Sequence, residues 1–191
     1  MYKLCKTERS AQRQRLLEQG LLNAMCTQHF DEISVSDLCD RIGVPRKSFY
    51  RYFSGKDGAL YALIDHTLLT YDGYVLEGKG GGKVIDLQEL ERFFLFWKEQ
   101  KPLVDALTRS NLSGLLVERM VTHAIEETLA PRSYMSHHAQ ERRSHAIVFT
   151  LSGLLAMMLA WHHEGYREDA KYMAEIAMKL VTEPLLYDST K

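Results

Sequence analysis

Residues 30–66 read FDEISVSDLCDRIGVPRKSFYRYFSGKDGALYALIDH, a stretch whose pattern predicts two short helices with a tight turn between them. Ser34 stands three residues before Asp37, which is the spacing of a helix start capped by a serine side chain. Gly43 breaks that helix. Pro45 suits the first turn of the next helix, because its missing N–H would have no intrahelical partner there. The stretch therefore predicts a helix-turn-helix.

The second helix of this pair has an apolar side and a cationic start. Phe49 and Phe53 are four residues apart, so they can face a core together with Leu38 and Ile42. The other faces hold Arg46, Lys47, Ser48, Tyr50, Arg51 and Tyr52. Cations in a first turn oppose the helix dipole, and this loss of local stability indicates an external anion. Lys56 begins the following helix, where free N–H groups and a lysine together suit a phosphate.

The remainder of the 191-residue chain also repeats with a period near 3.6 residues, and no alternating strand pattern is present. Ser54 and Asp57 open a fourth helix that runs towards Glu77. The other expected helices span about 8–28 with Thr7 as N-cap, 87–100 after an Asp86–Glu89 cap, 102–110, 113–129, 138–164 and 168–186. The sequence predicts an all-α fold with a three-helix head, residues 1–55, and a larger helical body, residues 56–191.

Charge is distributed unevenly along the chain. Residues 1–56 hold 10 Lys and Arg against 6 Asp and Glu, a net of +4, whereas residues 57–191 hold 14 against 19, a net of −5. A basic head on an acidic body indicates that the head is the part that meets a polyanion.

The chain lacks the marks of a secreted protein. No apolar run follows the two lysines of residues 1–6, so no secretory signal is predicted. Cys5, Cys26 and Cys39 are odd in number and have no metal or redox spacing. We expect reduced thiols in a cytoplasmic protein.

The segment 8–66 resembles the DNA-binding head of TetR-family transcriptional regulators. That family has a capped short helix, Gly-Val, then Ser/Thr-Phe/Leu-Tyr-x-His/Tyr-Phe and a Lys three residues later. The matching residues here are Ser34, Val35, Leu38, Gly43, Val44, Ser48, Phe49, Tyr50, Tyr52, Phe53 and Lys56. The chain length and the all-helical remainder also fit the family.

The resemblance implies that the helix from Pro45 to Tyr52 enters the major groove of DNA. Arg46, Lys47 and Tyr50 would then reach bases or nearby phosphates. The residues expected to contact DNA are Ser34, Ser36, Arg46, Lys47, Ser48, Tyr50, Arg51, Tyr52 and Lys56.

Two positions depart from the family pattern. His29 stands where a glycine commonly ends the first helix, and histidine tolerates a positive φ better than most residues. Ile42 stands where an alanine usually precedes Gly43, which asks for a wider gap between helices.

The body contains an uncharged run of sixteen residues, Ala146–Trp161. A membrane span needs about 20 apolar residues, and this run includes Thr150, Ser152 and Gly153 and has charged flanks, so we expect no membrane. A helix that is apolar all round is otherwise covered on every side, by its own core and by a second subunit.

The resemblance implies a homodimer joined through the last two helices. The small or apolar residues expected at this interface are Ser152, Ala156, Ala160, Ala170, Ala174, Ala177 and Val181.

The resemblance also implies an effector cavity in the body. Aromatic and methionine side chains are plentiful there, and a stripe of them is ordinarily core. Polar Asn111 and His123, in otherwise apolar stretches, are candidates to orient a hydrophobic or aromatic ligand. The candidate pocket residues are Phe93, Phe94, Trp97, Asn111, Met120, His123, Tyr134 and Met158.

Other chemistries have little support. Gly78–Lys83 is glycine-rich but lacks a preceding strand and the Walker spacing. The pairs His137–His138 and His162–His163 are adjacent, and neighbouring helical residues diverge by about 100°, so no metal site is predicted. No catalytic arrangement or cofactor motif is present, which predicts a protein that is not an enzyme and has no cofactor.

The sequence therefore predicts a sequence-specific, double-stranded-DNA-binding regulator that acts as a repressor and is released by a small-molecule effector. One alternative is a regulator controlled by a protein partner. Another is a small helical enzyme or carrier that uses the cavity of the body.

Overall fold

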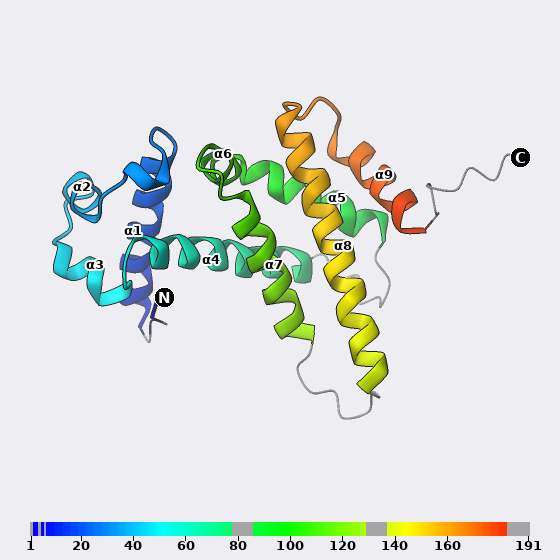
Figure 1. Cartoon of the computed structure of the whole chain (residues 1–191), viewed down its shortest axis with the longest axis horizontal. Helices are drawn as coiled ribbons and strands as arrows, with labels where there is room; N and C mark the ends of the chain where they lie inside the picture. Colours follow the sequence, from blue (N-terminus) through cyan, green and yellow to red (C-terminus); the bar gives the residue numbers. More distant parts are fainter. Residues whose placement is uncertain (1, 4, 6, 78–85, 129–136, 183–191) are drawn as a thin grey trace, which may run out of the picture. The chain divides into compact units, whose positions relative to one another are not determined.

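The computed structural model describes residues 2, 3, 5, 7–77, 86–128 and 137–182. Over these ranges the chain is helical and contains no strand, apart from one isolated bridge (Figure 1), which confirms the all-α prediction. The helices are α1 (Glu8–Met25), the 3-10 turn η1 (Phe30–Glu32), α2 (Val35–Arg41), α3 (Arg46–Tyr52), α4 (Lys56–Glu77), α5 (Leu87–Glu99), α6 (Lys101–Arg109), α7 (Ser113–Thr128), α8 (His137–His163) and α9 (Ala170–Thr182).

The chain forms two compact units. Unit 1 comprises residues 1–69 and 102–119, and unit 2 comprises residues 70–101 and 120–191. Both α4 and α7 contribute to each unit. The predicted boundary between a DNA-binding head and a regulatory body, at residues 55 and 56, is a functional division and not a division into compact units. It stays a prediction.

In unit 1, the start of α1 agrees with the prediction from the sequence, whereas its end does not. The Thr7 hydroxyl accepts a hydrogen bond from the Ser10 amide at 3.3 Å, as expected of an N-cap. The helix ends at Met25, three residues before the predicted end. His29 has φ −67° and caps η1, where its amide donates to the Glu32 carboxylate at 3.3 Å. The tolerance of histidine for a positive φ is therefore not needed at His29, since this residue opens a new turn with an ordinary φ.

The turn between α2 and α3 requires a glycine. Gly43 has φ +65°, and its amide donates to Asp40 at 3.3 Å while the Val44 amide donates to Cys39 at 3.0 Å. These two bonds form a Schellman motif, which satisfies the last carbonyls of α2. Pro45 is predicted to lie in the first turn of α3, but it is the N-cap residue, and its ψ of 137° is not a helical value.

A close approach between α1 and α2 explains how the chain accommodates Ile42. A Cβ placed on Gly20 of α1 would lie 2.7 Å from Ile42 Cγ2 and 3.6 Å from Leu38 Cδ1. The wider gap expected from Ile42 is therefore unnecessary, because glycine on the facing helix provides the space.

In unit 2, α5 packs against α9 and α8. Asp86 and Glu89 form the predicted cap of α5, with the Glu89 amide donating to Asp86 Oδ1 at 2.8 Å. The side of α5 facing inward carries Leu90, Phe93, Phe94 and Trp97, all buried. Helix α8 agrees with its predicted span within one residue at each end. Helix α9 begins two residues late, and the predicted continuation to residue 186 lies outside the described residues.

Candidate nucleic-acid interface

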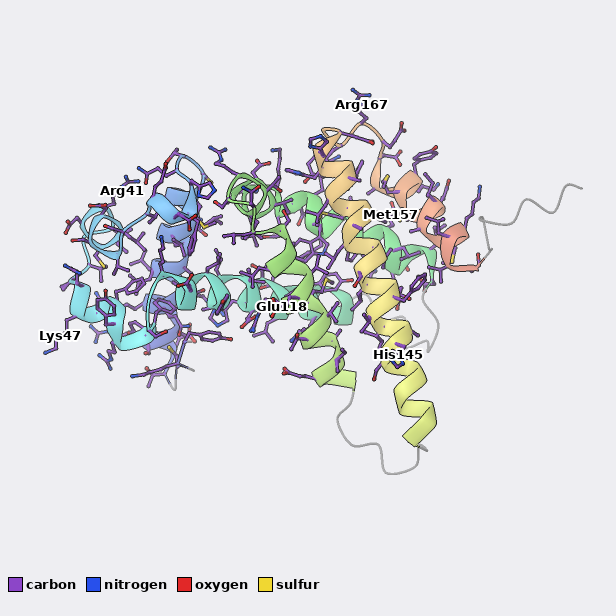
Figure 2. The ribbon with its side chains drawn as sticks, viewed as in Figure 1. Arg41, Lys47, Glu118, His145, Met157 and Arg167 are labelled. Carbon is purple, nitrogen blue, oxygen red and sulfur yellow. The ribbon has the colours of Figure 1, made fainter. Side chains whose placement is uncertain are left out.

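Helix α3 presents a cationic and aromatic surface to solvent. Arg46, Lys47 and Arg51 are exposed, and Tyr50 is 48% exposed. Figure 2 shows Lys47 extending from α3 away from α1. The first turn contains no acidic residue, so the positive end of the helix dipole is reinforced there. This surface favours an anionic partner.

Two phenylalanines hold α3 in place from its opposite side. Phe49 is fully buried and Phe53 is 2% exposed, with their ring centroids 5.1 Å apart. Leu38 is buried beside them in the core, whereas Ile42 is half-buried. The predicted inward face of α3 is confirmed, which fixes the outward direction of the cationic residues.

Two of the predicted DNA-contacting residues are occupied within the chain. Tyr52 is 5% exposed, and its hydroxyl lies 3.5 Å from that of Ser10. The Lys56 amine donates to the carbonyls of Phe30 at 2.8 Å and Asp31 at 2.9 Å, and lies 4.7 Å from the Phe30 ring centroid. Lys56 therefore joins η1 to the start of α4, which favours a positioning role over the predicted phosphate contact.

The predicted serine contacts lie at the helix starts. Ser34 is exposed, and its hydroxyl accepts from the Asp37 amide at 3.0 Å while donating to the Asp37 carboxylate at 2.7 Å. Ser36 and Ser48 are half-buried. The Ser48 amide is bonded to the Pro45 carbonyl at 2.8 Å.

A polar network, missed by sequence reasoning, joins α1, α4, α7 and the N-terminal segment in unit 1. Arg119 donates two hydrogen bonds to the Asp65 carboxylate, one of them from Nε at 2.7 Å. The Tyr2 hydroxyl donates to the same carboxylate at 2.8 Å. His66 Nδ1 lies 2.8 Å from Oε2 of the buried Glu18. These residues are scattered along the sequence, so no local pattern signals the network.

The network changes the titration of Tyr2. Burial, together with the hydrogen bond to Asp65, raises the pKa of the Tyr2 hydroxyl to about 12. The phenol therefore stays protonated and donates to the carboxylate throughout the neutral range.

The head matches a known family. A family model described as "Bacterial regulatory proteins, tetR family" matches residues 27–63, which contain η1, α2, α3 and the first part of α4. Residues 27–63 are therefore similar to the helix-turn-helix segment of the tetR family. The predicted resemblance to that family is confirmed for the helix-turn-helix.

Solved structures share the fold at low sequence identity. The fatty acid degradation regulator FadR from Bacillus halodurans is 12% identical, with a TM-score of 0.58 over 95% of this chain and 98% of that chain. The dihydroxyacetone kinase operon activator DhaS is 13% identical, with a TM-score of 0.52 over 88% of this chain and 93% of that chain. No curated protein sequence matches the chain significantly.

Beyond the tetR-type head, the predicted interface residues divide into two groups. Ala170, Ala174 and Ala177 are 5%, 0% and 1% exposed, so unit 2 already covers them and they have no surface to offer a second subunit. This part of the interface prediction is revised. Ser152 is half-buried, and the exposed members of the set are Ala156, Ala160 and Val181.

An apolar surface remains uncovered on α8. Phe149 is 80% exposed and lies on the same helical side as Ala156 and Ala160, opposite to the buried Leu154 and Met158. The segment Ser144–His163 has a mean hydropathy of 1.6, and 22% of it is buried. By length and composition alone this described helix could cross a membrane, although it also includes a side that packs into unit 2.

The predicted pocket residues do not form one group. Phe93, Phe94, Trp97, Met120 and Met158 are buried in unit 2. Asn111 belongs to unit 1, where it is exposed at a turn with φ +56°, and its place in the pocket stays a prediction. His123 Nε2 lies 2.6 Å from Asp72 Oδ2, and Tyr134 lies outside the described residues.

Titratable side chains elsewhere do not assemble into a metal site within the described ranges. No group of three or more His, Cys, Asp or Glu residues there is arranged to hold an ion. The three cysteines are free thiols, and burial raises the pKa of the Cys39 thiol, which lowers its reactivity.

Proposed function

We propose that this tetR-type regulator is a homodimeric repressor that binds a palindromic DNA operator and leaves it when a small molecule binds the body. The exposed cationic surface of α3, held by the buried Phe49 and Phe53, is the observation that carries the DNA-binding part. Two such helices related by a two-fold axis would read half-sites in consecutive major grooves.

The residues of α3 take separate roles in this proposal. Arg46, Lys47 and Tyr50 reach base edges or adjacent phosphates, because they are exposed and leave the helix away from its core. Arg51, whose guanidinium lies 6.0 Å from the Tyr52 ring centroid, contacts the DNA backbone together with the serines at the helix starts.

The uncovered surface of α8 supports the dimer. An apolar side chain as large as Phe149 at 80% exposure has an unfavourable contact with water, and exposed apolar patches of this kind mark interaction sites. The small side chains of Ala156 and Ala160 permit a partner helix to come close. On α9, the apolar side chains of Tyr172 and Leu180 are each 48% exposed as well.

The aromatic core of unit 2 supports a small-molecule effector. Trp97 is fully buried, and its indole N–H has no hydrogen-bond acceptor within the described residues. A buried donor without a partner costs about 1–3 kcal/mol, which an acceptor on a ligand would offset. We therefore expect a flat, mostly apolar effector with one acceptor atom. Its binding would change the separation of the two heads.

Operator selection from random duplexes, followed by titration at several salt concentrations, tests the DNA-binding part. Replacing Arg46 or Lys47 by alanine should weaken operator binding by about 1–3 kcal/mol per lost base contact and relax the preference at one position of each half-site. Failure to select any palindrome would overturn the proposal in favour of a helical enzyme or carrier.

Thermal shift with a panel of apolar molecules tests the effector part. A molecule that raises the melting temperature by mass action should also release the operator. If the Trp97→Phe protein binds it with undiminished affinity, the hydrogen-bond assignment is wrong. If no small molecule shifts the transition and a protein releases the DNA, control by a protein partner replaces the effector.

A further inference from the structure

We propose that the N-terminal segment ahead of α1 is a fixed part of the DNA-binding surface, and that Lys3 contacts a DNA phosphate beside the C-terminal end of α3. This inference rests on the proposed DNA binding and extends it to a segment outside the helix-turn-helix and outside the matched residues 27–63. The partner it requires is the backbone of duplex DNA.

Two attachments tie this segment to the head. Tyr2 pairs with Phe53 in a single antiparallel bridge, in which the Lys3 amide donates to the Tyr52 carbonyl at 3.0 Å. The Tyr2 hydroxyl donates to Asp65 on α4 at 2.8 Å. Chain ends usually fray because ordering them costs conformational entropy. Residues 2 and 3 are instead held against the last turn of α3.

The extended backbone decides where Lys3 points. Successive side chains of an extended segment leave on opposite sides. Tyr2 is directed to Asp65 on α4, so Lys3 is directed away from α4, and its side chain is exposed. Its amide donates to the carbonyl of Tyr52, the last residue of α3, so the exposed Lys3 side chain starts from the same end of α3 as the exposed Arg51.

Cations then occupy both ends of α3. Arg46 and Lys47 lie in its first turn, and Arg51 and Lys3 lie at its end. A helix of seven residues is about 10 Å long, which is close to the roughly 12 Å width of the major groove of B-DNA. Side chains from the two ends can therefore reach phosphates on opposite walls of the groove. A cation that is already held in place loses little entropy when it binds.

The alternative role for Lys3 is purely structural, since a cation near a helix C-terminus stabilises the helix. The salt dependence of binding separates these roles. Each phosphate contact contributes a slope of about −0.9 to the plot of log K against log salt. A structural role would lower the melting temperature and leave that slope unchanged.

The experiment uses the full chain with any purification tag at its C-terminus, and titrates the selected operator and a random duplex. Lys3→Ala should make the slope shallower by about one unit per subunit and weaken both duplexes about fivefold to tenfold at 0.1 M salt, with their ratio unchanged. Lys3→Arg should restore the slope. Tyr2→Phe keeps the charge but removes the bond to Asp65, so it should lose part of the same affinity.

Lys171→Ala is the matched control, because it removes an exposed lysine of α9 in unit 2. An unchanged slope in Lys3→Ala overturns the inference, whether or not the melting temperature falls. An equal loss in Lys171→Ala also overturns it, because net charge would then explain the effect. In either case, retained sensitivity to Arg46→Ala would leave the proposed function standing.

Discussion

Two carbonyl oxygens and an aromatic ring surround the Lys56 amine, and at the scale of single residues these contacts separate Lys56 from the cations of α3. In a sequence alone, any lysine in the first turn of a helix is a candidate to bind a phosphate. Only the fold brings the carbonyls of Phe30 and Asp31 within reach, from 26 and 25 residues earlier in the chain. Sequence reasoning identified the cation and could not identify its partners.

We expect Lys56→Met to lower the free energy of unfolding by about 1.5–3 kcal/mol, because two hydrogen bonds from a charged donor are lost while the apolar stem is kept. The salt slope of DNA binding should not change. Chemical denaturation and operator titration measure the two quantities. Lys47→Met is the control with the opposite pattern: nearly unchanged stability and a shallower slope. A shallower slope in Lys56→Met would restore the phosphate role.

Tyr2 gives a residue-scale prediction about pH. Its pKa is raised from 10.0 to about 12, so the folded state holds the phenolic proton more tightly than the unfolded state. The resulting stabilisation is complete below pH 10 and is lost as the pH rises from 10 to 12. After allowing for solvent screening at this half-buried side chain, the loss is about 1–2 kcal/mol.

Comparison with Tyr2→Phe isolates this contribution. The difference in unfolding free energy between the two proteins should be constant below pH 10 and shrink above it. Spectrophotometric titration should show one tyrosine fewer among those ionising late. If both proteins lose stability in parallel between pH 10 and 12, Tyr2 is not the group responsible.

At the scale of the helices, the contact of Gly20 with Ile42 sets the distance between α1 and α2. Gly20→Ala adds a Cβ 2.7 Å from Ile42 Cγ2. Overpacking of this kind costs about 1–3 kcal/mol, whereas alanine in place of glycine inside a helix gains about 0.5–1 kcal/mol. We expect a net loss of stability near 1 kcal/mol.

The sign should reverse in a second background. In the Ile42→Ala protein the methyl group that crowds the new Cβ is absent, so Gly20→Ala should be stabilising by its helix propensity alone. Denaturation of the four proteins of this double-mutant cycle measures the coupling. Additive effects of the two substitutions on the free energy of unfolding would mean that this contact does not set the distance between α1 and α2.

Capping residues made the helix limits predictable, because a cap is a local interaction. Thr7, Ser34 and the Asp86–Glu89 pair each lie where the pattern placed them. Which neighbour covers a helix face is not local. Ala170, Ala174 and Ala177 form a small-residue stripe that fits a subunit interface in the sequence, yet that stripe is buried inside unit 2, where α9 packs against α5.

At the scale of the whole molecule, the proposed sequence-specific binding calls for a second copy of the chain. A seven-residue recognition helix contacts few base pairs, whereas a two-fold dimer reads two half-sites about 34 Å or a multiple of that apart. The net charge of +4 in residues 1–56 supplies attraction to any DNA. Pairing of subunits would add the sequence preference.

Ala156→Arg tests the dimer where the structure leaves α8 uncovered. Ala156 is exposed on the side that carries Phe149. A single chain with arginine at this position should therefore fold normally, with the guanidinium group in contact with water. Between two copies the guanidinium would be desolvated without a partner, at a cost of several kcal/mol. We expect sedimentation as a monomer and loss of operator binding, with a circular dichroism spectrum like that of the parent.

Gln88→Arg is the control, because it adds the same side chain at an exposed position on α5. A dimeric Ala156→Arg protein with normal operator affinity would move the interface away from this surface of α8, and the exposed Phe149 would then need another partner.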